Sequence, residues 1–334
     1  MAGPDTPRRL ADLVQVRQAD EARMLEERVA ETADAGAAVK FAALVKDVLT
    51  AWINAFGSLT APGAGAKLAG LLADLRSKVE LAARGLPGRA QRTLSGALEE
   101  ATGLGARHAA QFLTRASGRQ HETPDVTVSR GTVREAAFLT GRVAEQLQMS
   151  NRLLTPRAVS GSGWRGVLAG VGAARRAAGV VRQAVGWGVQ RAVNDGAAQV
   201  ADHYGALLLW VAEPTACVRC AAYSGHITAP GGKFPGGLSM DPNSRVGRAS
   251  PIEGPPLHPN CRCRAVPWLP DWDTGPGTLP AFLRDQALLA VAAGEGRPSE
   301  SRAARRRAAQ ALLAQRGLSA RVRRQAAATA AGRT

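Results

Sequence analysis

Apolar residues recur three and four positions apart over much of the chain, and this is the spacing of one face of a helix. Two such faces consist of Phe41, Leu44, Val45, Val48 and Trp52, and of Leu68, Leu71, Leu72, Leu75 and Val79. Gly57 and Gly85 follow these faces as expected helix ends. Further helices are predicted over residues 90–117, 132–154, 164–205, 279–293 and 303–326, with breaks at TGLG after Ala101 and near Asn194-Asp-Gly196.

One segment, ALLLWVAEP at residues 206–214, has the short apolar pattern of a strand that ends at a proline. The chain from there to Pro270 is rich in turn residues. We therefore predict a mainly α fold with helical N-terminal and middle regions, a small α+β, loop-rich Cys/His module and a helical basic tail. The predicted divisions are an N-terminal helical region (1–120), a domain (127–274) that contains the module (206–270), and the tail (275–334).

Charge is distributed unevenly along the chain. The formal net charge is +16, yet residues 1–100 carry 13 basic and 13 acidic residues, whereas residues 275–334 carry 11 and 3. A basic surplus attracts polyanions, although a GC-rich genome also enriches arginine. Because the tail has few large apolar residues, we expect an exposed or loosely docked helix that binds duplex DNA weakly and without sequence preference. The alternatives are a solvated end, or a helix docked on a partner.

The chain carries no apolar stretch near the roughly 20 residues that a bilayer-spanning helix needs, and MAGPDTPRRLADL lacks the apolar region of a signal peptide. We expect a protein made and kept in a reducing cytoplasm. In that compartment, paired cysteines are more often metal ligands than disulfides.

All four cysteines lie in two clusters, Cys217-Val-Arg-Cys220 and His258-Pro-Asn-Cys261-Arg-Cys263. A CxxC loop can place two thiolates at adjacent corners of a tetrahedron, and the second cluster adds three candidate ligands. These five donors suit Zn²⁺, which accepts mixed thiolate and imidazole ligands. We expect Cys217 and Cys220 to bind with two of the other three. Such a metal would tie down a glycine-rich loop that has few apolar residues of its own.

Two other states of the cysteines stay open at this point. They could be reduced and simply buried, because free thiols pack as small apolar groups. They could also form two disulfides in an oxidising setting. The nearby His226 follows Ser-Gly and fits a turn residue better than a ligand.

The order of these features resembles the C-terminal region of the phage Mu F-like minor head proteins, also called phage head morphogenesis proteins. The family has a Trp-bearing strand, a Cys-x-x-Cys and a closing Pro-Pro-x-His-Pro-x-Cys-Arg-Cys. The matching residues, within about 187–267, are Trp210, Cys217, Cys220, Gly225, Pro255, Pro256, His258, Pro259, Asn260, Cys261, Arg262 and Cys263. One departure is Arg191-Ala-Val-Asn194, where many relatives have Arg-Thr-Glu, and it leaves the polar role of the preceding helix open.

This resemblance implies a non-enzymatic minor structural protein of a tailed-phage head, which acts in head assembly and in DNA packaging or ejection. Its implied partners are the portal protein, a major capsid or scaffolding protein and genomic DNA, with no membrane. Its implied location is the head interior or portal vertex, after assembly in the host cytoplasm. The alternatives are a zinc-dependent His-Asn-His-like nuclease and a capsid-maturation protease, but no second histidine follows His258 and no nucleophile signature accompanies the other histidines.

Overall fold

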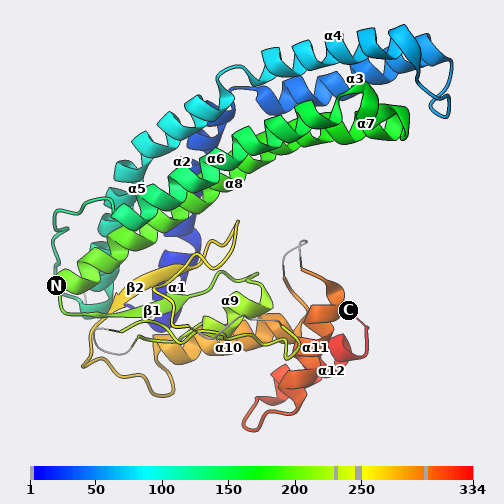
Figure 1. Ribbon diagram of the computed structural model, residues 1–334. Coiled ribbons are helices and arrows are strands. Elements are labelled where there is room, and N and C mark those ends of the chain that lie inside the picture. Colours follow the sequence, from blue (N-terminus) through cyan, green and yellow to red (C-terminus); the bar gives the residue numbers. More distant parts are fainter. Residues whose placement is uncertain (1–3, 229–231, 245–249, 297–299, 334) are drawn as a thin grey trace. The chain divides into compact units, whose positions relative to one another are not determined.

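The computed structural model describes residues 4–228, 232–244, 250–296 and 300–333. Its elements, drawn in Figure 1, are α1 (Pro7–Asp12), the π-helix η1 (Leu13–Gln18), α2 (Ala19–Asp34), α3 (Ala37–Phe56), α4 (Gly65–Ala83), α5 (Leu86–Ser117), α6 (Arg130–Leu153), α7 (Pro156–Ser160), α8 (Trp164–His203), β1 (Leu207–Val211), α9 (Val218–Tyr223), β2 (Arg264–Trp268), α10 (Leu279–Ala292), α11 (Arg302–Leu313) and α12 (Ala320–Ala330). The predicted fold class is confirmed, because these elements are helices apart from one pair of short strands. None of the described helices has both the length and the apolar character that crossing a bilayer requires.

Contacts between residues group the chain into two compact units, which are described separately. The first unit contains residues 1–24, 99–129 and 190–334, and the second contains residues 25–98 and 130–189. This grouping differs from the linear division expected from the sequence. The physical reason is that the long helices α5 and α8 each contribute to both units, so a boundary in space does not coincide with a loop.

The second unit contains the amphipathic helices predicted from spacing. Phe41, Leu44, Val48 and Trp52 of α3 are buried, as are Leu68, Leu72, Leu75 and Val79 of α4. Gly57 ends α3 with a φ of 80°, a left-handed conformation that glycine adopts without steric penalty. The Trp52 ring centroid lies 5.9 Å from that of Trp164, which joins α3 to the start of α8.

This unit differs from the expected helices in two places, the segment between residues 154 and 164 and the start of α6. The segment TPRAVSGSG contains the short helix α7, whose N-cap Thr155 accepts a hydrogen bond from the backbone N–H of Ala158. Helix α6 begins at Arg130, two residues before the expected start at residue 132, and Thr132 is buried inside it.

In the first unit, the glycines expected to break helices instead allow two helices to approach each other. Helices α5 and α8 run without interruption through TGLG and through Asn194-Asp-Gly196. A Cβ atom at Gly105 would overlap the backbone of Val193, and one at Gly196 would overlap the backbone of Thr102. The expected breaks were therefore wrong, because close packing of the two backbones compensates for the low helix propensity of glycine.

The two strands form an antiparallel pair in which Leu207 lies opposite Trp268 and Val211 lies opposite Arg264. One face of this pair packs on the N-terminal helices and on α10, in a core cluster of Leu10, Ala11, Val14, Phe112, Leu209, Val211, Val266, Trp268, Leu279 and Leu283. The strand predicted from ALLLWVAEP is confirmed as β1, and its partner follows the second cysteine cluster directly.

The basic tail is docked rather than loosely attached, so that expectation was wrong. It forms two helices, α11 and α12, with Gly317 at a φ of 78° in the turn between them. Ala308, Leu312 and Ala326 are buried in the core cluster that also contains Cys220. Alanines explain the discrepancy, because a face of small side chains packs closely against neighbouring helices without large apolar residues.

Polar contacts also hold the tail in place. The carboxylate of Asp241 accepts two hydrogen bonds from the Arg307 guanidinium, at 2.9 and 2.7 Å. The Thr329 hydroxyl donates to the carbonyl of Ala292 at 2.7 Å. The tail is therefore part of the unit that contains the cysteines.

Candidate metal centre

The first cysteine pair sits at the start of helix α9. Cys217 is the N-cap residue of this helix, with extended backbone, and Cys220 lies within the first turn. The Cys217 carbonyl accepts a hydrogen bond from the backbone N–H of Ala221 at 2.8 Å, which closes the turn. This local geometry places both sulfurs on the same side of the helix start, as a CxxC metal ligand pair requires.

The second cluster forms a tight turn that leads into β2. Asn260 has a φ of 64°, a left-handed conformation that asparagine tolerates, and the Cys261 N–H donates to the His258 carbonyl at 3.0 Å. Because β2 pairs with β1, the register brings Cys263 beside the end of β1, from which the chain continues to Cys217. The pairing of the strands therefore brings the two clusters together.

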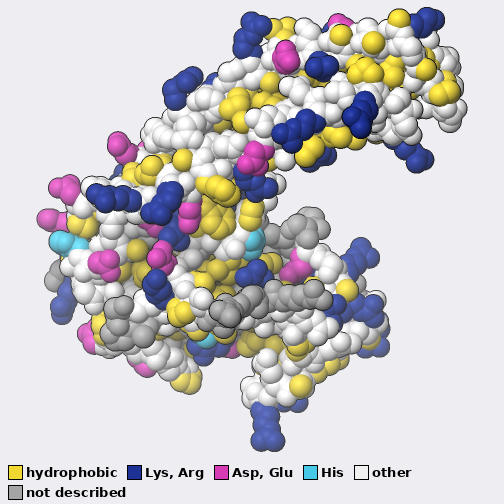
Figure 2. All heavy atoms as spheres, in the orientation of Figure 1, with side chains coloured by type: hydrophobic (Ala, Val, Ile, Leu, Met, Phe, Trp, Pro, Cys, Tyr) yellow, Lys and Arg dark blue, Asp and Glu magenta, His cyan; other side chains and the backbone are white. Residues whose placement is uncertain are grey.

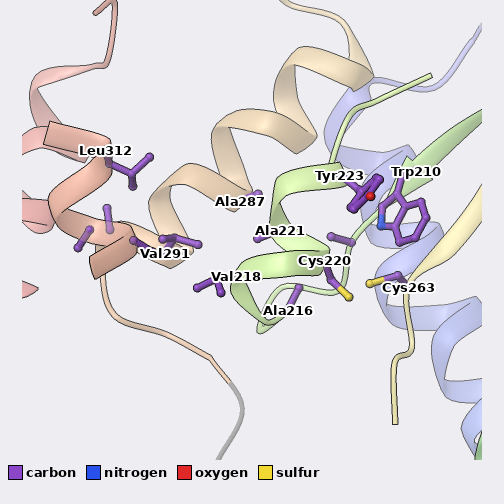
Figure 3. Close-up of a cluster of buried hydrophobic side chains, with 14 of the residues drawn as sticks. Trp210, Ala216, Val218, Cys220, Ala221, Tyr223, Cys263, Ala287, Val291 and Leu312 are labelled. Carbon is purple, nitrogen blue, oxygen red and sulfur yellow. The ribbon is translucent and has the colours of Figure 1, made fainter. Parts of the chain in front are cut away.

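The sulfur and nitrogen atoms converge as predicted. The His258 Nε2 lies 3.2 Å from the Cys217 Sγ and 3.3 Å from the Cys220 Sγ. The Cys220 Sγ lies 3.6 Å from the Cys261 Sγ. Two overlapping triads result, Cys217–Cys220–His258 and Cys220–Cys261–Cys263, with donor atoms in each triad within 4.8 Å of one another. Figure 3 shows the sulfurs of Cys220 and Cys263 turned toward each other beside Trp210.

These separations suit a metal ion. Two sulfurs bound to one tetrahedral zinc, each about 2.3 Å from the metal, lie about 3.8 Å apart, and a sulfur and an imidazole nitrogen lie about 3.5 Å apart. The observed distances of 3.2–3.6 Å are close to these values. All four cysteines are free thiols, so the disulfide alternative does not describe this structure. The group can hold a metal ion, and its donor set of thiolates and one imidazole fits a soft or borderline cation.

Three of the five donors are buried, and His258 is partly exposed. Cys220, Cys261 and Cys263 are at most 1% exposed, and Cys217 is partly buried. The buried Trp210 ring from β1 packs on Tyr223 and Phe234, with ring centroids 4.8 and 5.2 Å away, in the same core cluster as three of the cysteines.

Hydrogen bonds orient the imidazole. The Nδ1 of His258 donates to the Pro259 carbonyl at 2.8 Å, which leaves Nε2 facing the sulfurs. Such a bond on the far nitrogen fixes the ring orientation of a metal-binding histidine. The proline after His258 thus provides the carbonyl that holds the ring.

Without a metal, the sulfurs share protons. A hydrogen bond from the Cys220 thiol, with another from His258, lowers the pKa of Cys217 to about 4. The hydrogen bond to Cys217 raises the pKa of His258 to about 9. Hydrogen bonds from Cys220 and Cys263 hold the pKa of Cys261 well below its ordinary value. The cluster therefore favours thiolates at Cys217 and Cys261, which is the ionisation state that binds metal.

Sequence reasoning missed Asn194, which holds the second cluster from helix α8. Its side-chain amide donates to the carbonyl of Cys263 at 3.3 Å and accepts from the N–H of Ala265 at 2.8 Å. It also donates to the Gln190 carbonyl at 2.8 Å, and it is 5% exposed. The polar role left open for this helix is therefore a clamp on the backbone around Cys263. The signal was an asparagine among apolar residues in a helix that leads into β1.

Two other residues, His226 and Glu300, lie near the site and are not among the candidate ligands. His226 lies in the turn after α9, where its backbone carbonyl accepts from the N–H of Trp210 at 2.8 Å, and it is in neither triad. Glu300 was not anticipated. One of its carboxylate oxygens accepts from the Val218 N–H at 2.9 Å, and the other pairs with Arg305 at 3.2 Å. Glu300 therefore links the residue after Cys217 to helix α11.

Comparison with protein families, curated proteins and solved structures finds no match to this chain. The site must therefore be interpreted from its own residues.

Proposed function

We propose that this protein carries a structural zinc centre that closes a loop-rich module, and that the module belongs to a minor structural protein of a tailed-bacteriophage head. The observation that carries the proposal is the convergence of five donors in two triads that share Cys220, namely Cys217, Cys220, His258, Cys261 and Cys263, of which three cysteines are buried. Structural zinc sites are closed and use thiolate and imidazole ligands, whereas catalytic sites keep one position open to water or substrate.

The four ligands are Cys217, Cys220, His258 and Cys261. The first three form one triad, and the sulfur of Cys261 lies 3.6 Å from that of Cys220. Cys263 is the remaining donor. A hydrogen bond from Cys220 favours its thiolate, but the hydrogen bond to Cys261 and burial outweigh it and raise the pKa of the Cys263 thiol, whereas the pKa of Cys261 is lowered. When bound, the zinc would supply a cross-link between α9 and the turn before β2. In this proposal no residue of the site activates water.

The partners of the His258 ring favour a structural role over the nuclease alternative. A nuclease of the His-Asn-His type needs a histidine general base within reach of water and substrate. Here the Nε2 of His258 faces two sulfurs, and its Nδ1 is occupied by the Pro259 carbonyl. The geometry therefore supports a ligand role for this histidine rather than proton transfer.

The assignment to a phage head rests on the sequence resemblance, and the fold is compatible with it. The residues that carry the resemblance include Trp210 and the five candidate ligands, and these residues share one core or lie beside it. In this proposal the protein contacts the portal and a major capsid or scaffolding protein, and it acts in head assembly and in DNA packaging or ejection without catalysing a reaction.

The zinc centre and the role in the head are tested separately. Metal analysis of the purified protein should give about one zinc per chain, and Cys220→Ser should abolish binding; a metal-free protein with full stability would overturn the zinc centre. Co-expression with a portal protein from the same genome should give a co-purifying complex, and mass spectrometry of purified heads should detect the chain. The structural role would be overturned if the chain is absent from heads. It would also be overturned if the protein nicks duplex DNA in a reaction that requires added divalent metal and His258.

A further inference from the structure

The docked α11–α12 hairpin presents an unusual density of positive charge. Residues 300–333 contain nine arginines and one acidic residue, Glu300. Two of the arginines are neutralised within the fold, Arg305 by Glu300 and Arg307 by Asp241. The other seven are exposed: Arg302, Arg306, Arg316, Arg321, Arg323, Arg324 and Arg333. In Figure 2, dark blue side chains project from the part of the molecule where Figure 1 draws these helices.

Four of these arginines gather at the turn end of the hairpin, and we call Arg316, Arg321, Arg323 and Arg324 the tip cluster. Arg316 lies in the turn and the others lie in the first turns of α12. At a rise of 1.5 Å per residue, Arg321 and Arg324 are separated by only about 4.5 Å along the helix axis. No acidic residue follows Glu300 in the chain, so no nearby carboxylate in the tail offsets this charge.

The rest of the hairpin surface indicates which polyanion fits. A membrane-binding helix needs an apolar face of Leu, Phe or Trp in addition to its basic face. Here the apolar face of both helices is used inside the core, and Leu313, at 39% exposed, is the one exposed large apolar residue among the described residues of the tail. A lipid surface therefore has little apolar area to bind.

Two further classes of partner also fit poorly. Protein interfaces are anchored by buried aromatic and large apolar residues. Single-stranded nucleic acids are held by bases stacked on aromatic side chains. Residues 300–334 contain no Phe, Trp or Tyr. Exposed arginines without aromatic residues suit the phosphates of a duplex, which carries about one negative charge per 1.7 Å of its axis.

The geometry points to the tip cluster as a binding surface for the phosphate backbone of duplex nucleic acid, without base specificity. The surface is held in place by the fold. Ala308 and Leu312 of α11 and Val322 of α12 lie in the same core as Cys220, and Asp241 and Glu300 tie α11 to the α9 region. This inference rests on the charges and packing of the hairpin and does not depend on the proposed role in a phage head.

The test compares two quadruple variants of the full chain. One neutralises the tip cluster (R316Q/R321Q/R323Q/R324Q). The matched control neutralises four exposed arginines of the second unit (R142Q/R157Q/R165Q/R175Q). Fluorescence anisotropy with a mixed-sequence DNA duplex is measured at about 50 and 200 mM salt, where each phosphate contact contributes about −0.9 to the log–log slope.

The tip variant should bind at least about tenfold more weakly at the lower salt concentration, with a slope flatter by about 3 if three or four contacts are lost. The control should stay within about threefold of the wild type. A third variant, R316K/R321K/R323K/R324K, should keep the slope because charge is retained. Thermal unfolding of all variants checks folding, and the exposed tip side chains should not be needed for it.

Several outcomes would overturn the inference. These are an absence of duplex binding by the wild type, equal weakening by the tip and control variants, and an unchanged slope in a folded tip variant. Competition gives the last check at matched charge concentration. If polyglutamate or anionic lipid vesicles displace the labelled duplex as well as unlabelled duplex does, the partner is not a nucleic acid.

Discussion

Replacing Asn194 by alanine should destabilise the first unit more than any other single change of a polar residue on α8. The substitution leaves the buried N–H of Ala265 and the buried carbonyl of Cys263 without their side-chain partner. Each unsatisfied buried backbone group costs about 1–3 kcal/mol, and alanine returns about 0.5 kcal/mol through its higher helix propensity. We therefore expect a net loss of about 2–5 kcal/mol in the free energy of unfolding.

Helix α8 offers a matched control in Gln199. Its side-chain amide also bridges a backbone N–H and a carbonyl, those of Thr127, at 2.9 and 2.8 Å, but these bonds are exposed. Water replaces such bonds, so Gln199→Ala should change the free energy of unfolding by less than about 1 kcal/mol. The two variants thus remove the same kind of contact in different surroundings.

The assay is thermal unfolding of the wild type, Asn194→Ala and Gln199→Ala under identical conditions, followed by circular dichroism and by tryptophan fluorescence. At about 2–4 °C per kcal/mol for a unit of this size, Asn194→Ala should lower Tm by about 5–15 °C. Equal Tm values for the two variants would refute the argument, because they would show that burial of the Asn194 clamp contributes nothing.

Three further predictions follow from contacts described above. Gly105→Ala should destabilise α5–α8 packing by several kcal/mol, because its Cβ atom would overlap the backbone of Val193. Gly103→Ala should stabilise α5 by about 0.5–1 kcal/mol, because its Cβ atom meets only a flexible arginine side chain. Denaturant unfolding measures both changes. Cys261→Ser should abolish zinc retention and Cys263→Ser should preserve it, as measured by metal stoichiometry after dialysis against a weak chelator. The Arg307 hydrogen bonds lower the pKa of Asp241 from its ordinary 3.8. The ion pair therefore stabilises the fold above pH 3.8, and this stabilisation is lost as the pH falls through the lowered pKa. Asp241→Asn should reduce Tm at pH 7, and the Tm of this variant should fall less steeply than that of the wild type below about pH 4.

The sequence predicted the elements whose signals are local. Helical spacing identified the buried faces of α3 and α4, and ALLLWVAEP identified β1. The five candidate ligands were predicted because a metal site needs particular residue types at short spacing. The structure confirms that they converge, in two triads that share Cys220.

The errors came from interactions between distant segments. Gly105 and Gly196 were interpreted as helix breakers because propensity is a property of one helix, whereas their role depends on a second backbone close by. The docking of the tail was missed because alanines such as Ala308 contribute little to an apolar pattern yet pack closely. The partners of Asn194 could not be predicted, because they lie some 70 residues further along the chain.

The discontinuous make-up of the first unit has a consequence for synthesis of the chain on the ribosome. Its cores join Leu10 and Val14 to Leu283, and Cys220 to Val322, so neither core is complete until nearly the whole polypeptide has emerged. The second unit, by contrast, ends at residue 189 and can fold while translation continues. The four cysteines lie between residues 217 and 263, so they emerge after the second unit and stay exposed until the C-terminal helices follow. Closure of the Cys/His cluster is therefore one of the last steps in folding of the polypeptide.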